Sequence, residues 1–205
     1  VIAAAARTPI GKFNGSLAAL SAPQLGAAAI KGALTKANCP SSAVQQCYMG
    51  HAPARQAALA AGLSESVCCT TVNKVCSSGL KSIVLGAQQI MLGDAEVVVA
   101  GGMESMSNAP YCLSKARWGL RMGHAALTDS MIKDGLWDPY GDCHMGSYAE
   151  LCAETLRISR EEQDVHAEES YARSLAAISA GSFEEELIPL TVPKGKAETE
   201  EASYP

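Results

Sequence analysis

Aromatic side chains are scarce in this sequence: they make up 5% of its 205 residues, although 48% of the chain is hydrophobic. The core must therefore consist mainly of Ala, Val, Leu, Ile and Met. Small aliphatic residues let helices pack closely on a sheet, which favours a layered α/β architecture. The length suffices for one large domain, or for one domain with a sizeable insertion.

Basic runs and long apolar runs are also absent. The 16 Lys and Arg are outnumbered by 21 Asp and Glu, which gives a net charge of −5. This balance argues against nucleic-acid binding as a main role. No stretch approaches the ~18 consecutive apolar residues of a membrane-spanning helix, so we expect no membrane insertion.

Cysteine is abundant, but the pattern of a metal site or a disulfide framework is missing. No CxxC pair occurs, and the thiols are spread irregularly, which predicts a reducing compartment with mostly buried, inert cysteines. His144 beside Cys143 leaves zinc as an alternative that the spacing does not favour, and we predict no metal. The eight thiols are Cys39, Cys47, Cys68, Cys69, Cys76, Cys112, Cys143 and Cys152.

The first hundred residues alternate between strand and helix patterns, which predicts a mostly parallel sheet with helices on its faces. The helix after Cys76 repeats apolar residues at helical spacing on one face: Leu80, Ile83, Val84, Ala87, Ile90 and Met91. The predicted strands are Val1–Ala6, Val44–Gly50, Cys68–Val75 and Ala95–Gly102, and the other predicted helices are Ala22–Asn38 and Pro53–Gly62.

The pattern changes after Gly102. Residues Met103 to Met145 lack a long periodic run and predict an elaborated loop, which is often functional. Two helices follow, opened by the capping-box patterns Ser147-x-x-Glu150 and Ser159-x-x-Glu162. An edge-like strand is predicted over Glu185–Pro193, and a polar surface segment from Lys194 to the end.

Cys76 stands where the third predicted strand gives way to a helix. Unpaired N–H groups at a helix start favour the thiolate, and Ser77, Ser78 and Gly79 leave room for a bulky acyl donor. Ligands also collect at the carboxyl ends of parallel strands. The alternative is a small hydrophobe that fills a strand–helix corner, as we expect for Cys68 and Cys69. Position alone does not decide between the two.

The stretch VNKVCSSGLKSIVLGAQQIMLGDAEVVVAGGMESMS, which contains Cys76, resembles the acyl-enzyme region of thiolases. AARTPIGKFNGSL (Ala5–Leu17), APARQAALAAG (Ala52–Gly62) and ISREEQDVHAEES (Ile158–Ser170) also resemble segments of that family, in the same order. The similarity covers essentially the whole chain.

The resemblance implies a thiolase-like layered α/β fold: a mostly parallel mixed sheet with helices on both faces, plus a mainly helical loop insert. Residues 1–110 would form the amino-terminal α/β domain without its last strand. Residues 111–205 would form the loop domain that covers the coenzyme A site. The carboxyl-terminal thiolase domain would lie outside these residues.

The resemblance also implies an acyltransferase that uses coenzyme A thioesters as substrates and needs no other cofactor. Cys76 would take an acetyl group from acetyl-CoA, and the acetyl-enzyme would condense with a second acetyl-CoA to give acetoacetyl-CoA in a reversible ping-pong reaction. The backbone N–H of Cys76 would be one oxyanion donor.

The segment DGLWDPYGDCHMGSYAE (Asp134–Glu150) resembles the short-chain thiolases, in which a His-Met pair lines the acyl pocket. His144 and Met145 match that pair and would bind substrate. The alternative for His144 is a loop histidine that packs against the following helix.

Some family features are missing. Neither the Gly-His-Pro nor the Cys-x-Gly motif of the second thiolase half occurs, and YMGHAPARQ (Tyr48–Gln56) is shorter than the matching family segment. We therefore expect residues to be missing near His51 and after Pro205. A catalytically silent fragment that binds coenzyme A or assists assembly is the alternative function. A ketoacyl synthase is a third, disfavoured by NKVCSSG and CHMG.

The expected partners follow from the same resemblance. We expect a homo-oligomer, either a dimer or a tetramer, with contacts between dimers around Ser114–Thr128. The cytoplasm is the expected compartment, with the mitochondrion and the peroxisome as alternatives. The sequence does not determine the preferred direction of the reaction.

Overall fold

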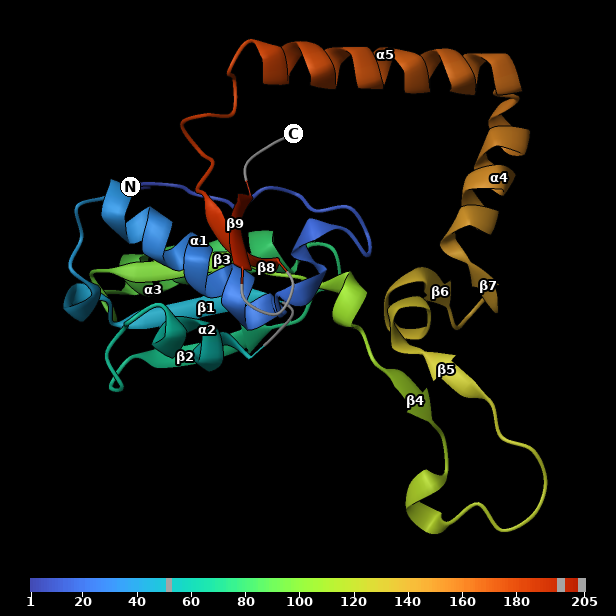
Figure 1. The fold of residues 1–205 in the computed structure, drawn as a ribbon, viewed down its shortest axis with the longest axis horizontal. Coiled ribbons are helices and arrows are strands. Elements are labelled where there is room, and N and C mark those ends of the chain that lie inside the picture. Colours follow the sequence, from blue (N-terminus) through green and yellow to red (C-terminus); the bar gives the residue numbers. More distant parts are fainter. Residues whose placement is uncertain (51–52, 195–197, 203–205) are drawn as a thin grey trace. The chain divides into compact units, whose positions relative to one another are not determined.

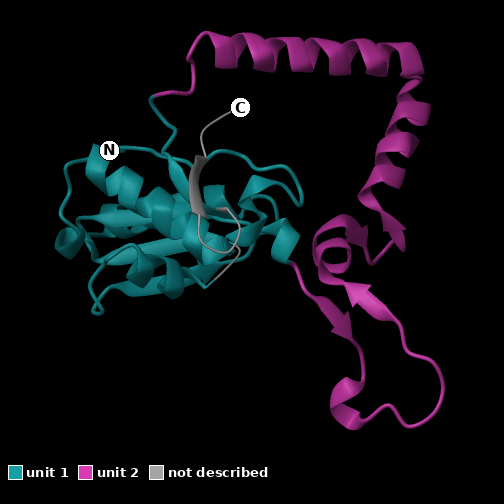
Figure 2. Ribbon diagram, viewed as in Figure 1, with its two compact units in different colours: residues 1–108, 185–205 teal, residues 109–184 magenta. Residues whose placement is uncertain are grey.

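The computed structural model describes residues 1–50, 53–194 and 198–202, and the chain forms two compact units (Figure 2). Unit 1 comprises residues 1–108 and 185–205, and unit 2 comprises residues 109–184. The expected break in the chain near His51 falls outside the described residues. No helix within the described ranges is long and apolar enough to cross a membrane.

Unit 1 is built on a three-stranded, all-parallel sheet in the order β2-β1-β3. In the register, Cys47 of the central strand lies between Cys69 and Val99. The strand–helix alternation of the sequence is thus confirmed as an α/β fold with a parallel sheet. The strands are β1 (Gln46–Gly50), β2 (Cys68–Val72) and β3 (Val98–Gly102).

Two helices, α1 (Ala22–Lys36) and α2 (Ala54–Ala60), cover one face of this sheet (Figure 1). Their small residues pack on the side chains of β1 that point to this face, Cys47 and Met49. The core is made almost entirely of aliphatic and sulfur-containing side chains, as the scarcity of aromatics requires. Its helical members include Ala27, Ile30, Ala54, Ala57 and Ala58.

Helix α3 (Ser78–Leu92) covers the opposite face, and it packs with the side that was not expected to do so. The buried residues of α3 are Ser78, Ser82 and Gly86. Because they are small, the helix approaches the strands closely on this side. The apolar face expected from the periodicity is exposed: Leu80 is 66% exposed and Met91 85%.

The predicted strand Val1–Ala6 is wrong. Val1 and Ile2 are exposed, and only Arg7 makes a bridge, a parallel one to Leu187. The Arg7 N–H donates to the Glu186 carbonyl (2.8 Å), and the Ile188 N–H donates to the Arg7 carbonyl (3.0 Å). A strand needs a continuous row of such bonds, and within the described residues this segment forms only the one bridge.

The described residues 185–194 and 198–202 belong to unit 1, whereas the sequence grouped them with the loop region. Strand β8 (Leu190–Lys194) pairs with an unexpected antiparallel strand, β9 (Glu198–Ala202). Leu190 and Val192 are buried against Leu17 and Leu20, which explains why this segment belongs to the first unit. The described part of unit 1 also contains the short 3-10 helices η1 (Ser16–Ala19), η2 (Ser41–Ala43) and η3 (Met106–Asn108).

Unit 2 consists of two small antiparallel hairpins followed by two helices. Helix α5 begins with the expected capping box: the Ser159 hydroxyl accepts from the Glu162 N–H (3.2 Å), and the Glu162 carboxylate accepts from the Ser159 N–H (2.7 Å). Helix α4 starts at Met145, earlier than the predicted Ser147 cap. The elements are β4 (Tyr111–Leu113), η4 (Ala116–Trp118), β5 (Leu127–Asp129), η5 (Ile132–Leu136), β6 (Trp137–Asp138), β7 (Cys143–His144), α4 (Met145–Leu156) and α5 (Arg160–Ser179).

Candidate active site

Cys76 lies in the turn between β2 and α3, and its side chain is exposed. Strand β2 ends at Val72, and Ser77 is the N-cap residue of α3. Because the three strands are parallel, their carboxyl ends share this edge of the sheet, where ligands collect in α/β folds. The predicted junction is confirmed, and the role of Cys76 as nucleophile stays a prediction.

The residue before Cys76 has an unusual backbone. Val75 has a φ of +50°, in the left-handed region that a β-branched residue rarely adopts. Such a conformation costs on the order of 1–3 kcal/mol and persists only where the surroundings enforce it. The Asn73 side-chain oxygen accepts a hydrogen bond from the Val75 N–H (3.0 Å), and the Ser77 N–H donates to the Lys74 carbonyl (3.1 Å).

Glycines at the strand ends let α3 approach the sheet directly beneath this turn. A Cβ atom at Gly50 would lie 2.5 Å from the Ser78 Cβ, and one at Gly102 would lie 3.2 Å from the Gly79 Cα. The Ser82 hydroxyl lies 2.6 Å from the carbonyl oxygens of both Gly79 and Gly101. A single hydroxyl proton serves these two acceptors, so the start of α3 is tied to the end of β3.

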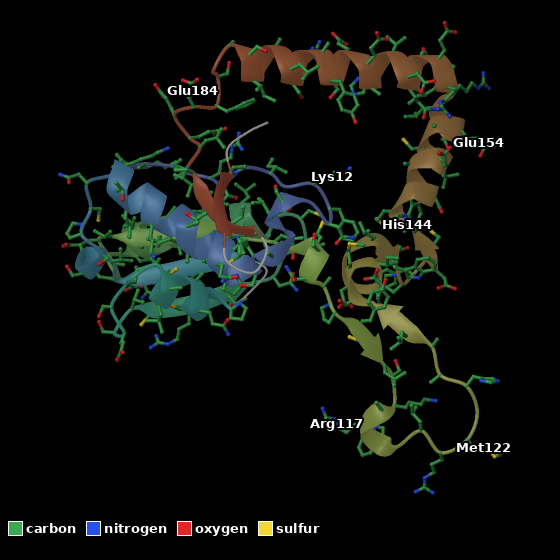
Figure 3. The ribbon with its side chains drawn as sticks, in the orientation of Figure 1. Lys12, Arg117, Met122, His144, Glu154 and Glu184 are labelled. Carbon is green, nitrogen blue, oxygen red and sulfur yellow. The ribbon has the colours of Figure 1, made fainter. Side chains whose placement is uncertain are left out.

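His144 lies where the β6–β7 hairpin passes into α4 (Figure 3). Met145 is the first residue of α4, and both side chains are exposed. His144 is the N-cap residue: its Nδ1 accepts from the Gly146 N–H at 3.0 Å. Because a backbone N–H can only donate, Nδ1 must accept, and a neutral imidazole therefore carries its proton on Nε2. The cap fits the structural alternative for His144, and it leaves the Nε2 proton for a ligand.

Asp138 organises the same hairpin, and sequence reasoning missed it. Its Oδ2 accepts from the Tyr148 hydroxyl (2.7 Å) and from the Gly141 N–H (2.7 Å). The hydrogen bond from Tyr148 is the main cause that lowers the pKa of the Asp138 carboxyl, and the same bond is the largest of the causes that raise the pKa of Tyr148 to about 12. An aspartate ten residues before a helical tyrosine is no recognisable signal without the hairpin that brings them together.

The other thiols differ from the expectation of mostly buried cysteines. Cys47 alone is fully buried, whereas Cys68, Cys112 and Cys152 are exposed and Cys39, Cys69 and Cys143 are intermediate. Burial raises the pKa of Cys47 to about 12 and also raises that of Cys69. The expectation fails for Cys68 because it stands at the start of an outer strand of the sheet.

Cys76 belongs to unit 1, and His144 and Met145 belong to unit 2. Their assignment as one site stays a prediction. Within the part of the chain that the structure describes, no group of three or more His, Cys, Asp or Glu side chains is arranged to hold a metal ion.

Comparison with known proteins gives a consistent result. Residues 1–204 match the family model described as "Thiolase, N-terminal domain". The chain is 54% identical over 203 residues to acetyl-CoA acetyltransferase 2 of Arabidopsis thaliana, covering 95% of this chain and 50% of that protein. It is 52% identical over 206 residues to acetyl-CoA acetyltransferase of Pseudomonas aeruginosa, covering 97% of this chain and 52% of that protein.

The human mitochondrial acetyl-CoA acetyltransferase is also similar, with 51% identity over 200 residues, 94% of this chain and 46% of the human protein. The chain therefore spans about half the length of the curated relatives that it matches.

Proposed function

Because this chain belongs to the thiolase family, whose N-terminal domain it matches over residues 1–204, we propose that it supplies the acylated cysteine of an acetyl-CoA C-acetyltransferase. The observation that carries the proposal is the exposed Cys76, in the family's motif, at the carboxyl edge of a parallel sheet. The relatives named acetyl-CoA acetyltransferase support the reaction class.

In the first half-reaction, the Cys76 thiolate attacks the carbonyl carbon of acetyl-CoA. A carbon–sulfur bond forms to Cys76, the bond to the coenzyme A sulfur breaks, and coenzyme A leaves with the electron pair and then takes a proton. The backbone N–H of Cys76 stabilises the negative charge that develops on the carbonyl oxygen. The product is an acetyl-cysteine thioester, itself a good acyl donor.

In the second half-reaction, the methyl carbon of another acetyl-CoA loses a proton and attacks the acetyl carbon on Cys76. The Cys76 sulfur leaves as thiolate, and acetoacetyl-CoA is released. The two steps together convert two acetyl-CoA into acetoacetyl-CoA and coenzyme A, and each is reversible. The groups that move the protons would belong to the family's Gly-His-Pro and Cys-x-Gly motifs, which do not occur in these residues.

We assign His144 and Met145 to the substrate pocket. The Nε2 proton of His144 is available to donate to a carbonyl or amide oxygen of the substrate, since Nδ1 is occupied by the Gly146 N–H. Met145, exposed at the first position of α4, offers an adaptable apolar contact for an acyl or pantetheine chain. Of residues 111–205, the part that lies in unit 2, residues 111–184, would act as the loop domain over coenzyme A.

We also propose a homo-oligomer, a dimer or tetramer, in the cytoplasm. The relatives from Homo sapiens and Bos taurus are named as mitochondrial, so the mitochondrion remains the leading alternative compartment. Imaging of the tagged protein decides between them, and light scattering gives the oligomeric state.

The decisive experiment mixes the full polypeptide that carries this sequence briefly with acetyl-CoA, quenches with acid, and measures intact and peptide masses. We expect one adduct of ~42 Da, on the peptide that contains Cys76, from acyl transfer to the nucleophile. Cys76→Ala removes the adduct and lowers turnover on the order of 10³-fold or more. Cys68→Ala removes an exposed thiol from the other end of β2 and is the matched control, which keeps the adduct.

The alternative, a catalytically silent module that binds coenzyme A or assists assembly, predicts a different result. It gives no adduct on Cys76 in the full polypeptide, while coenzyme A still binds in calorimetry. That outcome rejects the acyltransferase proposal. Transfer from an acylated carrier protein instead of acetyl-CoA identifies a ketoacyl synthase.

A further inference from the structure

The Ser78 side chain makes two hydrogen bonds to the strained turn that carries Cys76. Its hydroxyl donates to the Val75 carbonyl oxygen (2.6 Å) and accepts from the Lys74 N–H (2.9 Å). The backbone N–H of Ser78 donates to the same Val75 carbonyl (3.1 Å). Ser78 thus binds the chain on both sides of Val75, the residue with the left-handed backbone.

The hydrogen bond from Ser78 to the Val75 carbonyl also constrains Cys76, because a peptide bond joins Val75 to Cys76. The carbonyl of Val75 and the N–H of Cys76 belong to one planar peptide unit, and no cis peptide bond occurs among the described residues. In a trans peptide the C=O and N–H point in opposite directions. Whatever fixes the carbonyl of Val75 therefore also fixes the direction of the Cys76 N–H.

Ser78 itself is held by the sheet. It is 2% exposed, and its Cβ lies so close to Gly50 at the end of β1 that a side chain there would collide with it. One turn later, the Ser82 hydroxyl contacts the Gly101 carbonyl at the end of β3. The start of α3, which carries Ser78, is therefore packed against the ends of both β1 and β3.

We propose that Ser78 is a positioning residue, which aims the backbone N–H of Cys76 at the thioester oxygen and holds its sulfur beside the start of α3. The inference rests on the proposed function, because it assigns Ser78 to the same acyl-transfer step. Ser78 does not need to touch the substrate: it acts through the shared peptide plane. Its removal should therefore lower kcat and leave KM nearly unchanged.

The test measures kcat, KM for acetyl-CoA and thermal stability in the full polypeptide with Ser78→Ala. A misaimed donor predicts a fall in kcat of ~10- to 100-fold with KM within ~2-fold. Ser77→Ala is the matched control, because the neighbouring Ser77 makes no side-chain capping bond and is exposed. It should keep kcat within ~2-fold, in line with an exposed side chain without special contacts.

A second variant separates positioning from mere structural support. Val75→Gly relieves the left-handed strain, because glycine adopts positive φ without cost. In the double variant Val75→Gly/Ser78→Ala, the melting temperature should recover while kcat stays low, since the carbonyl of residue 75 still lacks the hydrogen bond from the Ser78 hydroxyl. Val75→Gly alone keeps the hydroxyl and should turn over at least ~5-fold faster than the double variant, by the same argument on donor aim.

Recovery of kcat together with the melting temperature in the double variant would overturn the proposal, as would a Ser78→Ala enzyme with the kcat of Ser77→Ala. Alkylation by iodoacetamide distinguishes this failure from that of the proposed function, because it needs no coenzyme A. If the wild type forms no acetyl adduct, the function falls. Slower alkylation of Cys76 in Ser78→Ala than in Ser77→Ala still supports the positioning role of Ser78, and equal rates reject it.

Discussion

At the scale of single residues, the sheet and the turn give two cysteines opposite properties. Cys47 is 0% exposed on β1, the central strand of the sheet, and burial raises its thiol pKa to about 12. Cys76 is exposed in a turn beside the amino-terminal end of α3. Since the thiolate is the reactive form, exposure and environment decide which thiol reacts.

We predict that iodoacetamide at a pH of ~8 modifies Cys76 and leaves Cys47 unmodified in the native full polypeptide, because almost no thiolate forms at a buried thiol. Peptide mass spectrometry after timed quenching measures both rates. In denaturant the difference disappears, which provides the control. Equal alkylation rates for Cys47 and the exposed Cys68 in the native protein would show that Cys47 is not buried.

At the scale of elements, the packing of α3 on the sheet depends on small residues. Ser78, Ser82 and Gly86 face the strands, and Gly50 and Gly102 receive the first turn of the helix. The interface brings backbone close to backbone, so there is no flexible side chain that could yield to an added methyl group. The close approach also sets the position of the turn that carries Cys76.

Gly50→Ala should therefore destabilise the protein by about 1–3 kcal/mol, the usual cost of overpacking a well-packed interior. The added Cβ would lie 2.9 Å from the Ser78 carbonyl carbon and 3.0 Å from the Gly79 nitrogen. Urea unfolding measures the change.

Gly135→Ala is the control for this substitution, because a Cβ there meets no atom within 4 Å and no positive φ is involved. It should change the free energy of unfolding by less than ~0.5 kcal/mol. Equal stability of the two variants would show that the contact between β1 and α3 is looser than the structure indicates.

At the scale of the whole molecule, one face of α3 exposes a row of apolar side chains. Leu80, Ile83, Val84, Ile90 and Met91 all lie on it and are all exposed. A contiguous apolar face of this kind marks an interaction surface. The chain spans about half the length of the curated relatives that it matches.

We predict that the chain of residues 1–205, produced alone, binds the dye ANS strongly, whereas the full polypeptide binds it weakly, because exposed apolar surface is what ANS detects. The double substitution Leu80→Ser/Met91→Ser should reduce the ANS fluorescence of the isolated chain. The matched change Leu59→Ser, at an exposed leucine of α2, should have little effect. Strong binding by the full polypeptide would mean that this face stays uncovered.

The sequence alone determined the strand–helix alternation, the parallel sheet, the capping box of α5 and the junction at Cys76. These follow from local periodicity, caps and turns, which act over a few residues. Only the tertiary structure decided which face of α3 meets the sheet and that Val1–Ala6 forms no strand. It also decided the β8–β9 pair and the hydrogen bond from Ser78 to the Val75 carbonyl. In each, the outcome depends on which distant backbone comes close. Periodicity shows that a helix has an apolar face, but the space left by Gly50 and Gly102 favours the serine face instead.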